Sequence, residues 1–278
     1  MKTILGNEFL KTFFKWRSYI GFIAIAVVVP LVEIALKVEG GSIVKAMTRN
    51  LPQDLFLPPN LFNAYFVTLF IMNFLWVHVP FLISLVAGDQ LAGEGSGGTF
   101  RLLLTRPPSR SYILFCKYLV TLLYTTLLVV FLAALAVGLG ILLFGTGDLL
   151  VPGKGMTILA TAEVPGRLCI AFLLAIWSMW CVASLAFLFS SLVENAIGPI
   201  IGSMAVIIVF LIISNIPVSL FAAVKPFLFT TYFNVWQHAV EQPVPWDKII
   251  SSVAILGAFS AGFYLVTWSC FVRKDILT

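Results

Sequence analysis

The sequence predicts an all-α integral membrane protein with six transmembrane helices and an amphipathic helix at its N-terminus. Of its 278 residues, 60% are hydrophobic and only 10% are charged. A soluble domain usually carries about a quarter charged residues, so this chain has too few charges to cover a water-exposed surface. Its mean hydropathy of +1.05 points the same way. We expect residues 1–278 to form a single transmembrane domain.

The first segment, MKTILGNEFLKTFFKWR, places apolar residues from Leu5 to Trp16 at helical spacing, opposite Lys11 and Lys15. This pattern predicts an amphipathic helix that lies in the membrane interface. A frayed basic terminus is the alternative. The segment is not expected to be a signal peptide, because basic residues are spread among its apolar ones and no small-residue cleavage site follows.

Six stretches are long and apolar enough to cross about 30 Å of hydrocarbon, which takes about 20 residues. They are residues 18–37, 62–87, 112–144, 167–193, 196–218 and 249–272. The third is too long for one straight crossing, so we expect it to tilt or to project from the bilayer. Only Glu194 and Asn195 separate the fourth from the fifth, which predicts a tight helical hairpin.

Lysine and arginine are unevenly shared between the two sides of this arrangement. The N-terminal segment, the 88–111 loop, the 194–195 turn and the C-terminal tail, together with Lys117, hold ten of the 17 Lys and Arg residues. The other side holds seven, five of them in the longer loops 38–61, 145–166 and 219–248 and two, Lys37 and Arg167, at the adjoining span ends. Because cytoplasmic loops are enriched in positive residues, we expect both termini to lie in the cytoplasm. We expect the membrane of this multi-pass protein to be the bacterial cytoplasmic (inner) membrane. The basic residues form no stripe that predicts a nucleic-acid partner.

Polar residues inside a span are costly and are candidates for function. In the second span, Asn73 and Trp76 share one helix face, and His78 follows them; these three residues are a possible translocation path. The alternative for His78 is a hydrogen bond to a neighbouring helix. Glu33 and Lys37 lie four residues apart in the first span, in the favourable order for an ion pair.

The aromatic residues of the 219–248 loop favour a belt at the membrane interface. A role in an outer gate or a substrate exit is the alternative. The four cysteines form no metal-ligand spacing, and the chain shows no catalytic motif. We therefore expect no enzyme activity, metal or cofactor in this chain.

The 88–111 loop carries the most specific information. Its glycines allow a sharp turn, Thr99 can cap a short helix of apolar residues that begins at Phe100, and Pro107 and Pro108 end that helix. An exposed apolar helix needs a cover, either lipid headgroups or a partner protein. A GxGxxG match at Gly93 is attributed to chance, because a membrane span precedes it rather than a strand.

This loop resembles the signature of type-2 ABC transporter permeases, the ABC-2 type membrane subunits. The residues that carry the resemblance are Glu94, Gly98, Thr99, Leu103, Leu104, Pro107 or Pro108, Ser109, Arg110 and Lys117. The six-span layout, the N-terminal helix and the short 194–195 turn are also similar to that family. One departure is the Gly95-Ser96-Gly97 stretch, where the family more often has bulkier residues.

The resemblance implies the membrane-spanning permease subunit of an ATP-binding-cassette exporter, whose ATP and Mg are bound by a separate ATPase. A short cytoplasmic coupling helix within residues 89–106 would dock on that ATPase. The docking residues would be Asp89, Glu94, Gly98, Thr99, Phe100, Arg101, Leu103, Arg106 and Glu194. Two permease copies, as a homodimer or heterodimer, and two ATPase copies would form the working unit in the lipid bilayer, with the second and fifth spans lining the path.

Two other functions are open from the sequence. One is an ATP-independent secondary transporter or channel, against which the few charges at mid-membrane weigh. The other is a membrane anchor that recruits an ATPase for a different purpose.

Overall fold

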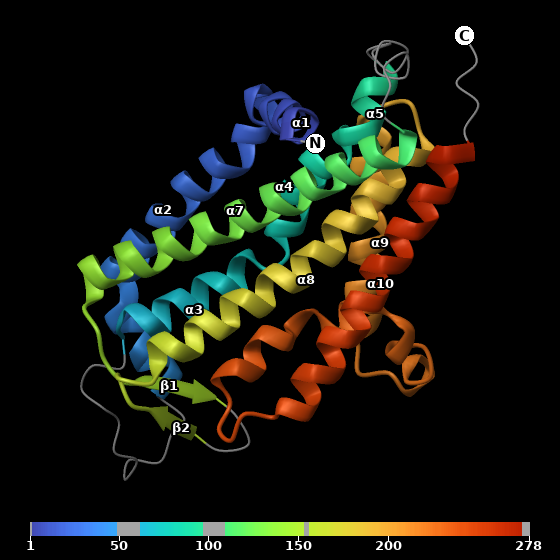
Figure 1. Cartoon of the computed structure of the whole chain (residues 1–278). Helices are drawn as coiled ribbons and strands as arrows, with labels where there is room; N and C mark the ends of the chain where they lie inside the picture. Colours follow the sequence, from blue (N-terminus) through green and yellow to red (C-terminus); the bar gives the residue numbers. More distant parts are fainter. Residues whose placement is uncertain (1, 49–61, 97–108, 153–155, 274–278) are drawn as a thin grey trace.

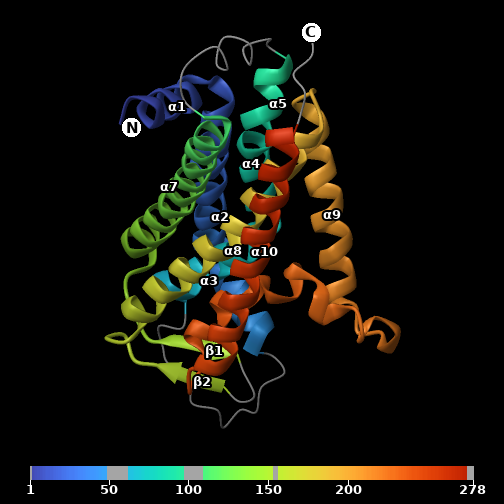
Figure 2. The ribbon, with the colours of Figure 1, turned by 45° about the vertical axis from the view of Figure 1, so that its right-hand side comes forward.

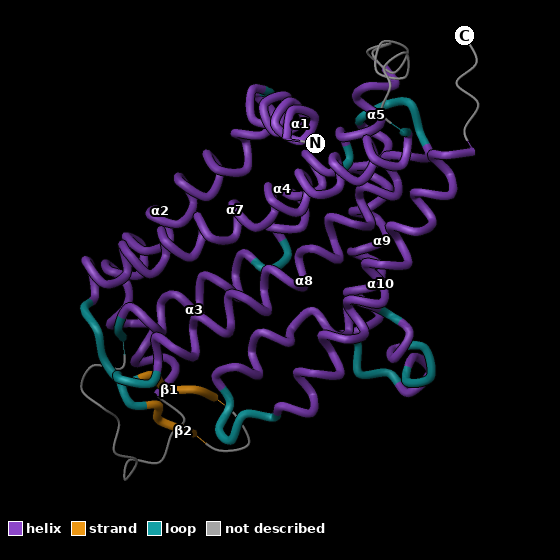
Figure 3. Tube along the Cα trace, in the orientation of Figure 1, coloured by secondary structure: helices purple, strands orange, loops and turns teal. Residues whose placement is uncertain are grey.

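The computed structural model describes residues 2–48, 62–96, 109–152 and 156–273, which form a bundle of long helices (Figure 1). The α-helices are α1 (Lys2–Phe14), α2 (Trp16–Thr48), α3 (Ala64–Leu75), α4 (His78–Ala87), α5 (Asp89–Ser96), α7 (Arg110–Phe144), α8 (Val164–Leu192), α9 (Ile197–Asn215) and α10 (Trp246–Arg273). The remaining elements are the strands β1 (Leu149–Pro152) and β2 (Met156–Leu159) and the 3-10 helices η1 (Ser219–Phe221), η2 (Lys225–Phe227) and η3 (Phe229–Val240). Figure 3 shows how completely helix dominates these residues.

Five helices of the described residues are long and apolar enough to cross a membrane, namely α2 over Trp16–Gly40, α7, α8, α9 and α10. The α3–α4 pair passes the same test only when taken together, and it is bent by 58° at a short break. The chain is therefore a helical, multi-pass membrane protein, with a sixth span if the bent pair crosses as one unit. Most helix ends lie close to the predicted span limits, but α2 continues to Thr48, well past the predicted end at Lys37.

α8 is the central helix of the bundle. It packs against α4, α5, α7, α9, α10 and η3, and 67% of its most apolar window is buried, against 17–28% in the other four candidate spans. Those four helices expose many apolar side chains, among them Leu142, Ile201 and Ile250. A helix that is apolar all round and only partly covered by its own chain is the expected neighbour of lipid.

The bend between α3 and α4 follows from Pro80. Proline lacks a backbone N–H, and its ring clashes with the carbonyl four residues earlier, which belongs to Trp76. The break falls at this point, since α3 ends at Leu75 and α4 begins at His78. The 62–87 span is thus divided into two helices of different direction.

The predicted outer loops contain more structure than their composition indicates. Within 145–166, β1 and β2 form an antiparallel hairpin that pairs Leu149 with Leu159. This hairpin is the one departure from an all-α fold among the described residues. In 219–248, Phe229, Phe233 and Trp236 of η3 are buried in the main apolar core, so the interfacial-belt interpretation is wrong for these three residues.

Candidate functional site

α1, α5 and the first turns of α7 meet at one end of the bundle, where α10 also ends (Figure 2). We call this end the α1 end and the opposite one, which carries β1 and β2, the hairpin end. The beginning of the predicted docking segment, residues 89–96, is α5 and lies at the α1 end (Figure 1). Its side chains show what holds that segment in place.

Glu8, Lys11, Glu94 and Lys117 form a buried charge cluster at the α1 end. Lys117 is its centre, since its Nζ lies 2.6 Å from Glu8 Oε2 and 2.7 Å from Glu94 Oε1 and its side chain is only 1% exposed. Lys11 Nζ lies 3.2 Å from Glu94 and 3.5 Å from Glu8, on the side nearer to solvent. Two ammonium groups thus balance two carboxylates, which is the condition under which buried charges are tolerated.

The electrostatics of Lys11 agree with this geometry. Burial lowers the pKa of its ammonium group, but the carboxylates of Glu94 and Glu8 outweigh burial and hold the pKa above the ordinary value of 10.5. A neighbouring negative charge favours the charged form of an amine. Lys11 is therefore a cation at neutral pH and completes the charge balance of the cluster.

A second set of ion pairs holds the beginning of α5. Asp89 Oδ2 lies 2.8 Å from Lys15 Nζ, and Asp89 Oδ1 accepts a hydrogen bond of 2.7 Å from Arg17 Nη1. Lys15 and Arg17 flank the junction between α1 and α2, so Asp89 joins that junction to α5. A carboxylate in the first turn of a helix is also favoured by the helix dipole.

Neutral hydrogen bonds connect α5 to α8. Ser190 Oγ accepts from the amides of Leu91 and Ala92, at 3.0 and 2.9 Å, and donates to the carbonyl of Gly88 at 2.6 Å. One buried hydroxyl therefore satisfies three backbone groups where α4 gives way to α5. On the other side, Gln90 Nε2 donates to Thr12 Oγ1 of α1 at 3.1 Å.

The structure places the predicted docking residues in three groups. Asp89 and Glu94 are 8% and 7% exposed and pair within the chain. Glu194 is exposed in the turn between α8 and α9. It lies beside the last turn of α5, where a Cβ added to Gly95 would be 3.7 Å from Glu194 Cα. Gly98, Thr99, Phe100, Arg101, Leu103 and Arg106 lie outside the described residues. Docking itself stays a prediction for all nine.

The bend between α3 and α4 separates the three residues predicted for the path. Asn73 Oδ1 accepts a hydrogen bond of 2.9 Å from Gln237 Nε2, and the ring of Trp76 lies 5.4 Å from that of Trp236, so both face η3. His78 instead lines a cavity of about 450 Å³ between α2, the bend and α9. This cavity has the size of a ligand site, and its lining is otherwise apolar.

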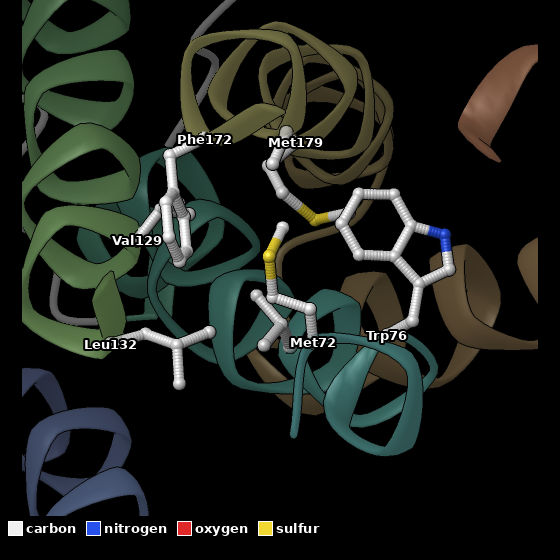
Figure 4. Close-up of a pocket in the computed structure, with 8 residues that line it drawn as sticks. Met72, Trp76, Val129, Leu132, Phe172 and Met179 are labelled. Carbon is white, nitrogen blue, oxygen red and sulfur yellow. The ribbon is translucent and has the colours of Figure 1, made fainter. Parts of the chain in front are cut away.

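Trp76 also closes a second, much smaller space of about 10 Å³ between α3, α7 and α8. Figure 4 shows the sulfur atoms of Met72 and Met179 beside its ring, with the indole nitrogen pointing away from the space. Phe172 and Leu132 line it from the neighbouring helices. A space of this size and polarity is a packing gap at the bend rather than a ligand site.

Reasoning from the sequence missed Glu8, Ser190 and Gln237 as members of these sites. Glu8 gave a weak signal, since it precedes Lys11 by three residues on the same helix. Within the described residues, no group of three or more His, Cys, Asp and Glu side chains is placed to hold a metal ion. All four cysteines are free thiols.

The predicted ion pair between Glu33 and Lys37 is not formed in this structure. Lys37 Nζ donates to the carbonyl of Leu143 and lies 5.3 Å from the centre of the Phe144 ring. Glu33 is fully buried, and neither of its carboxyl oxygens has a hydrogen-bond partner among the described residues. The last carbonyls of α7 have no N–H donor within the helix, so the ammonium group of Lys37 binds there instead.

Comparison with known proteins relates this chain to a protein family and to a curated bacterial protein. The family model described as "Protein of unknown function (DUF2705)" matches residues 55–277. A curated relative, "Uncharacterized protein YhcI" of Bacillus subtilis (strain 168), is 30% identical over 205 residues, which cover 69% of this chain. The match spans 63% of that relative, less than two thirds of its length.

Proposed function

This chain belongs to the DUF2705 family, and we propose that it is the membrane-spanning permease subunit of an ATP-binding-cassette exporter. The observation that carries the proposal is the ion pair between Glu94 and Lys117, at 2.7 Å in a buried site. These are two of the residues on which the resemblance to type-2 permeases rests; Glu94 lies within the predicted docking segment 89–106, and Lys117 lies beyond its end. Their contact closes that loop at its base.

In this proposal the α1 end faces the cytoplasm and the segment 89–106 docks on a separate ATPase subunit. α5 is held to α1 by ion pairs and to α8 by Ser190. A loop whose base is fixed to three helices passes a displacement on to all of them. Asp89 and Glu94 then act by holding the base of the loop, and residues from Gly98 to Arg106, with Glu194, supply the contacts with the ATPase.

The working unit in this proposal has two permease copies and two ATPase copies in a bacterial cytoplasmic membrane. ATP and Mg bind the ATPase, whereas this chain supplies the path. The cavity of about 450 Å³ at His78 supports a path between α2, the α3–α4 bend and α9. Its apolar lining favours a hydrophobic or amphiphilic cargo, for which a lining without charge costs no desolvation.

An ATP-independent secondary transporter or channel is the second candidate. The observation that favours it is the broken α3–α4 pair, because secondary transporters build their sites from discontinuous helices. The two candidates differ in whether an ATPase binds the α1 end, so the same experiment separates them.

The test is co-purification in detergent with the ATPase encoded beside this chain, followed by an assay of vanadate-sensitive ATP hydrolysis. The variant carries Phe100→Asp and Leu103→Asp in the docking segment. The matched control carries Leu220→Asp and Phe227→Asp, which change the same two residue types at exposed positions far from the α1 end. Both pairs add two charges, so general effects on solubility cancel.

We expect the ATPase to co-purify with the wild type and with the control, and to be lost from the docking variant. Loss from both variants, or from neither, would contradict docking through 89–106. If no ATPase binds the wild type, and purified chains in liposomes carry a solute down an ion gradient, the second candidate is correct.

A further inference from the structure

The first candidate span carries a buried carboxyl group that the proposed function does not use. Glu33 lies on α2 roughly 25 Å along the helix from Trp16, at 1.5 Å per residue. It is 0% exposed, on the same face as Val29 and Leu36, which belong to the main apolar core. Neither carboxyl oxygen has a partner among the described residues.

An ionised carboxylate is not stable in such a place. Without a counter-charge or a hydrogen-bond donor, a buried carboxyl group keeps its proton and stays neutral. Even the neutral form is costly there, because its polar atoms are desolvated without compensation. An ionisable group without a partner inside a span is by default a candidate for function.

Lys37 is the cation nearest to Glu33 along α2. It lies one helical turn beyond Glu33, with the acid N-terminal to the base, the arrangement in which such pairs are most favourable. In the structure its ammonium group donates a hydrogen bond to the carbonyl of Leu143 at the end of α7 and lies over the Phe144 ring. The lysine therefore has two candidate acceptors, the carboxylate of Glu33 and the end of α7.

Few other ionisable groups lie on the elements that pack against this part of α2. The half of α7 from Val129 to Phe144 contains none. On α3, Tyr65 belongs to the separate apolar cluster at the hairpin. On α4, His78 lines the cavity beside Ile25 and Val28, two turns nearer to the α1 end. On α2 itself, Glu39 follows Lys37. Among the described residues, Lys37 is thus the only cation on α2 close in sequence to Glu33.

We propose that Glu33 is a proton-binding site whose alternative ligand is Lys37. In the described arrangement Glu33 holds a proton and Lys37 binds the Leu143 carbonyl. In the second arrangement the proton leaves Glu33 for water, the ammonium group of Lys37 moves to the new carboxylate, and the Leu143 carbonyl is released. The net charge of the pair falls by one, which is the proton released. Proton binding at Glu33 thereby sets whether α2 is tied to the end of α7.

Dicyclohexylcarbodiimide tests this proposal, because it is apolar and reacts with protonated carboxyl groups in apolar surroundings. The carboxyl oxygen bonds to the carbodiimide carbon, the acid proton moves to its nitrogen, and the adduct rearranges to a stable acylurea that mass spectrometry locates. The wild-type protein is labelled in liposomes over a series of pH values. Glu94 is the internal control, since it is also buried but is paired with Lys117 and Lys11.

We expect Glu33 to be labelled about tenfold faster than Glu94 or more, because only Glu33 carries its proton. Labelling of Glu33 should fall as the pH rises. In Lys37→Gln, which cannot pair with the carboxylate, labelling should persist to higher pH, and Lys37→Arg should behave like the wild type. Glu33→Gln should remove the adduct from its peptide.

Two results would overturn the proposal. One is wild-type Glu33 labelled no faster than Glu94, which needs no variant to fold. The other is the same pH dependence in Lys37→Gln as in the wild type, which would leave Lys37 no part in the titration. Neither result bears on ATPase docking, so this proposal and the proposed function stand or fall separately.

Discussion

Replacing Lys117 by methionine tests whether the buried charge cluster holds the α1 end together. The substitution keeps most of the side-chain volume and removes the charge, which leaves Glu8 and Glu94 with Lys11 as their remaining cation. Removing one partner of a buried ion pair costs about 3–5 kcal/mol. Because Lys11 stays within 3.5 Å of both carboxylates, we expect a loss at the lower end, about 3 kcal/mol in the free energy of unfolding.

Lys11→Met is the matched control, since it removes the other cation of the same cluster. The side chain of Lys11 is 46% exposed, and half-exposed ion pairs are screened by water, so its loss should cost about 1 kcal/mol or less. The assay is unfolding by SDS in mixed micelles, followed by circular dichroism. The two variants should differ by about 2 kcal/mol, roughly thirtyfold in the equilibrium constant.

A triple variant separates buried charge from lost packing. Glu8→Gln and Glu94→Gln, added to Lys117→Met, remove both buried carboxylates and leave only the half-exposed ammonium group of Lys11, so most of the stability should return. If Lys117→Met costs no more than Lys11→Met, or if the triple variant is no more stable than Lys117→Met alone, the cluster does not stabilise this end of the protein in the way described.

Two further predictions concern single polar groups. Ser190→Ala should cost about 1–3 kcal/mol of unfolding free energy, because the buried amides of Leu91 and Ala92 lose their acceptor. The control Ser251→Ala, at an exposed position, should cost about 0.5 kcal/mol or less. Equal costs for the two variants would argue against the Ser190 contact. At Asp148, hydrogen bonds from the hydroxyl and the amide of Thr161 hold the pKa of the carboxyl below the ordinary 3.8. A lowered pKa stabilises the folded state at pH values above the ordinary pKa, and this stability is lost as the pH falls through the lowered pKa. The hydrogen-exchange protection of β1 and β2, corrected for intrinsic rates, should therefore fall in acid below about pH 3.8. Asp148→Asn should remove this dependence, and an unchanged acid profile in that variant would contradict it.

The helices were predictable from the sequence because lipid imposes a simple rule. A chain in hydrocarbon must satisfy its backbone hydrogen bonds within each segment, so hydropathy alone locates the helices. The predicted limits of the third span, 112–144, are close to those of α7, Arg110–Phe144. The break in the 62–87 span was not predicted, because a proline alone does not locate a break: Pro30 lies inside α2, which continues past it to Thr48.

The side-chain partners at the α1 end were not predictable, because they are distant in the chain. Lys117 pairs with Glu8 across 109 residues, and Arg17 with Asp89 across 72. Helical periodicity reports only neighbours three or four residues away. It gave the wrong partner for Lys37, where the end of α7 supplies an acceptor that no local pattern contains. The prediction of an interfacial belt failed for the aromatic residues of η3 for a related reason, since composition does not distinguish a buried ring from one at the membrane interface.

The position of the charge cluster relative to the α3–α4 bend explains how the two sites can act together. Residues from His78 to Gly95 form one helical segment on the far side of the bend, so His78 and Glu94 lie roughly 24 Å apart along it at 1.5 Å per residue. The cluster and Ser190 hold one end of this segment to α1, α7 and α8. The other end lines the cavity beside α2 and α9, at the point where Pro80 has already interrupted the backbone hydrogen bonds. A helix is stiff along its axis and a break is not, so in the proposed function a displacement of Glu94 by the ATPase would turn this segment about Trp76 and Val77 and move the wall of the cavity. Coupling of this kind would require no chain of specific side-chain contacts between the sites, because a single rigid element would carry it.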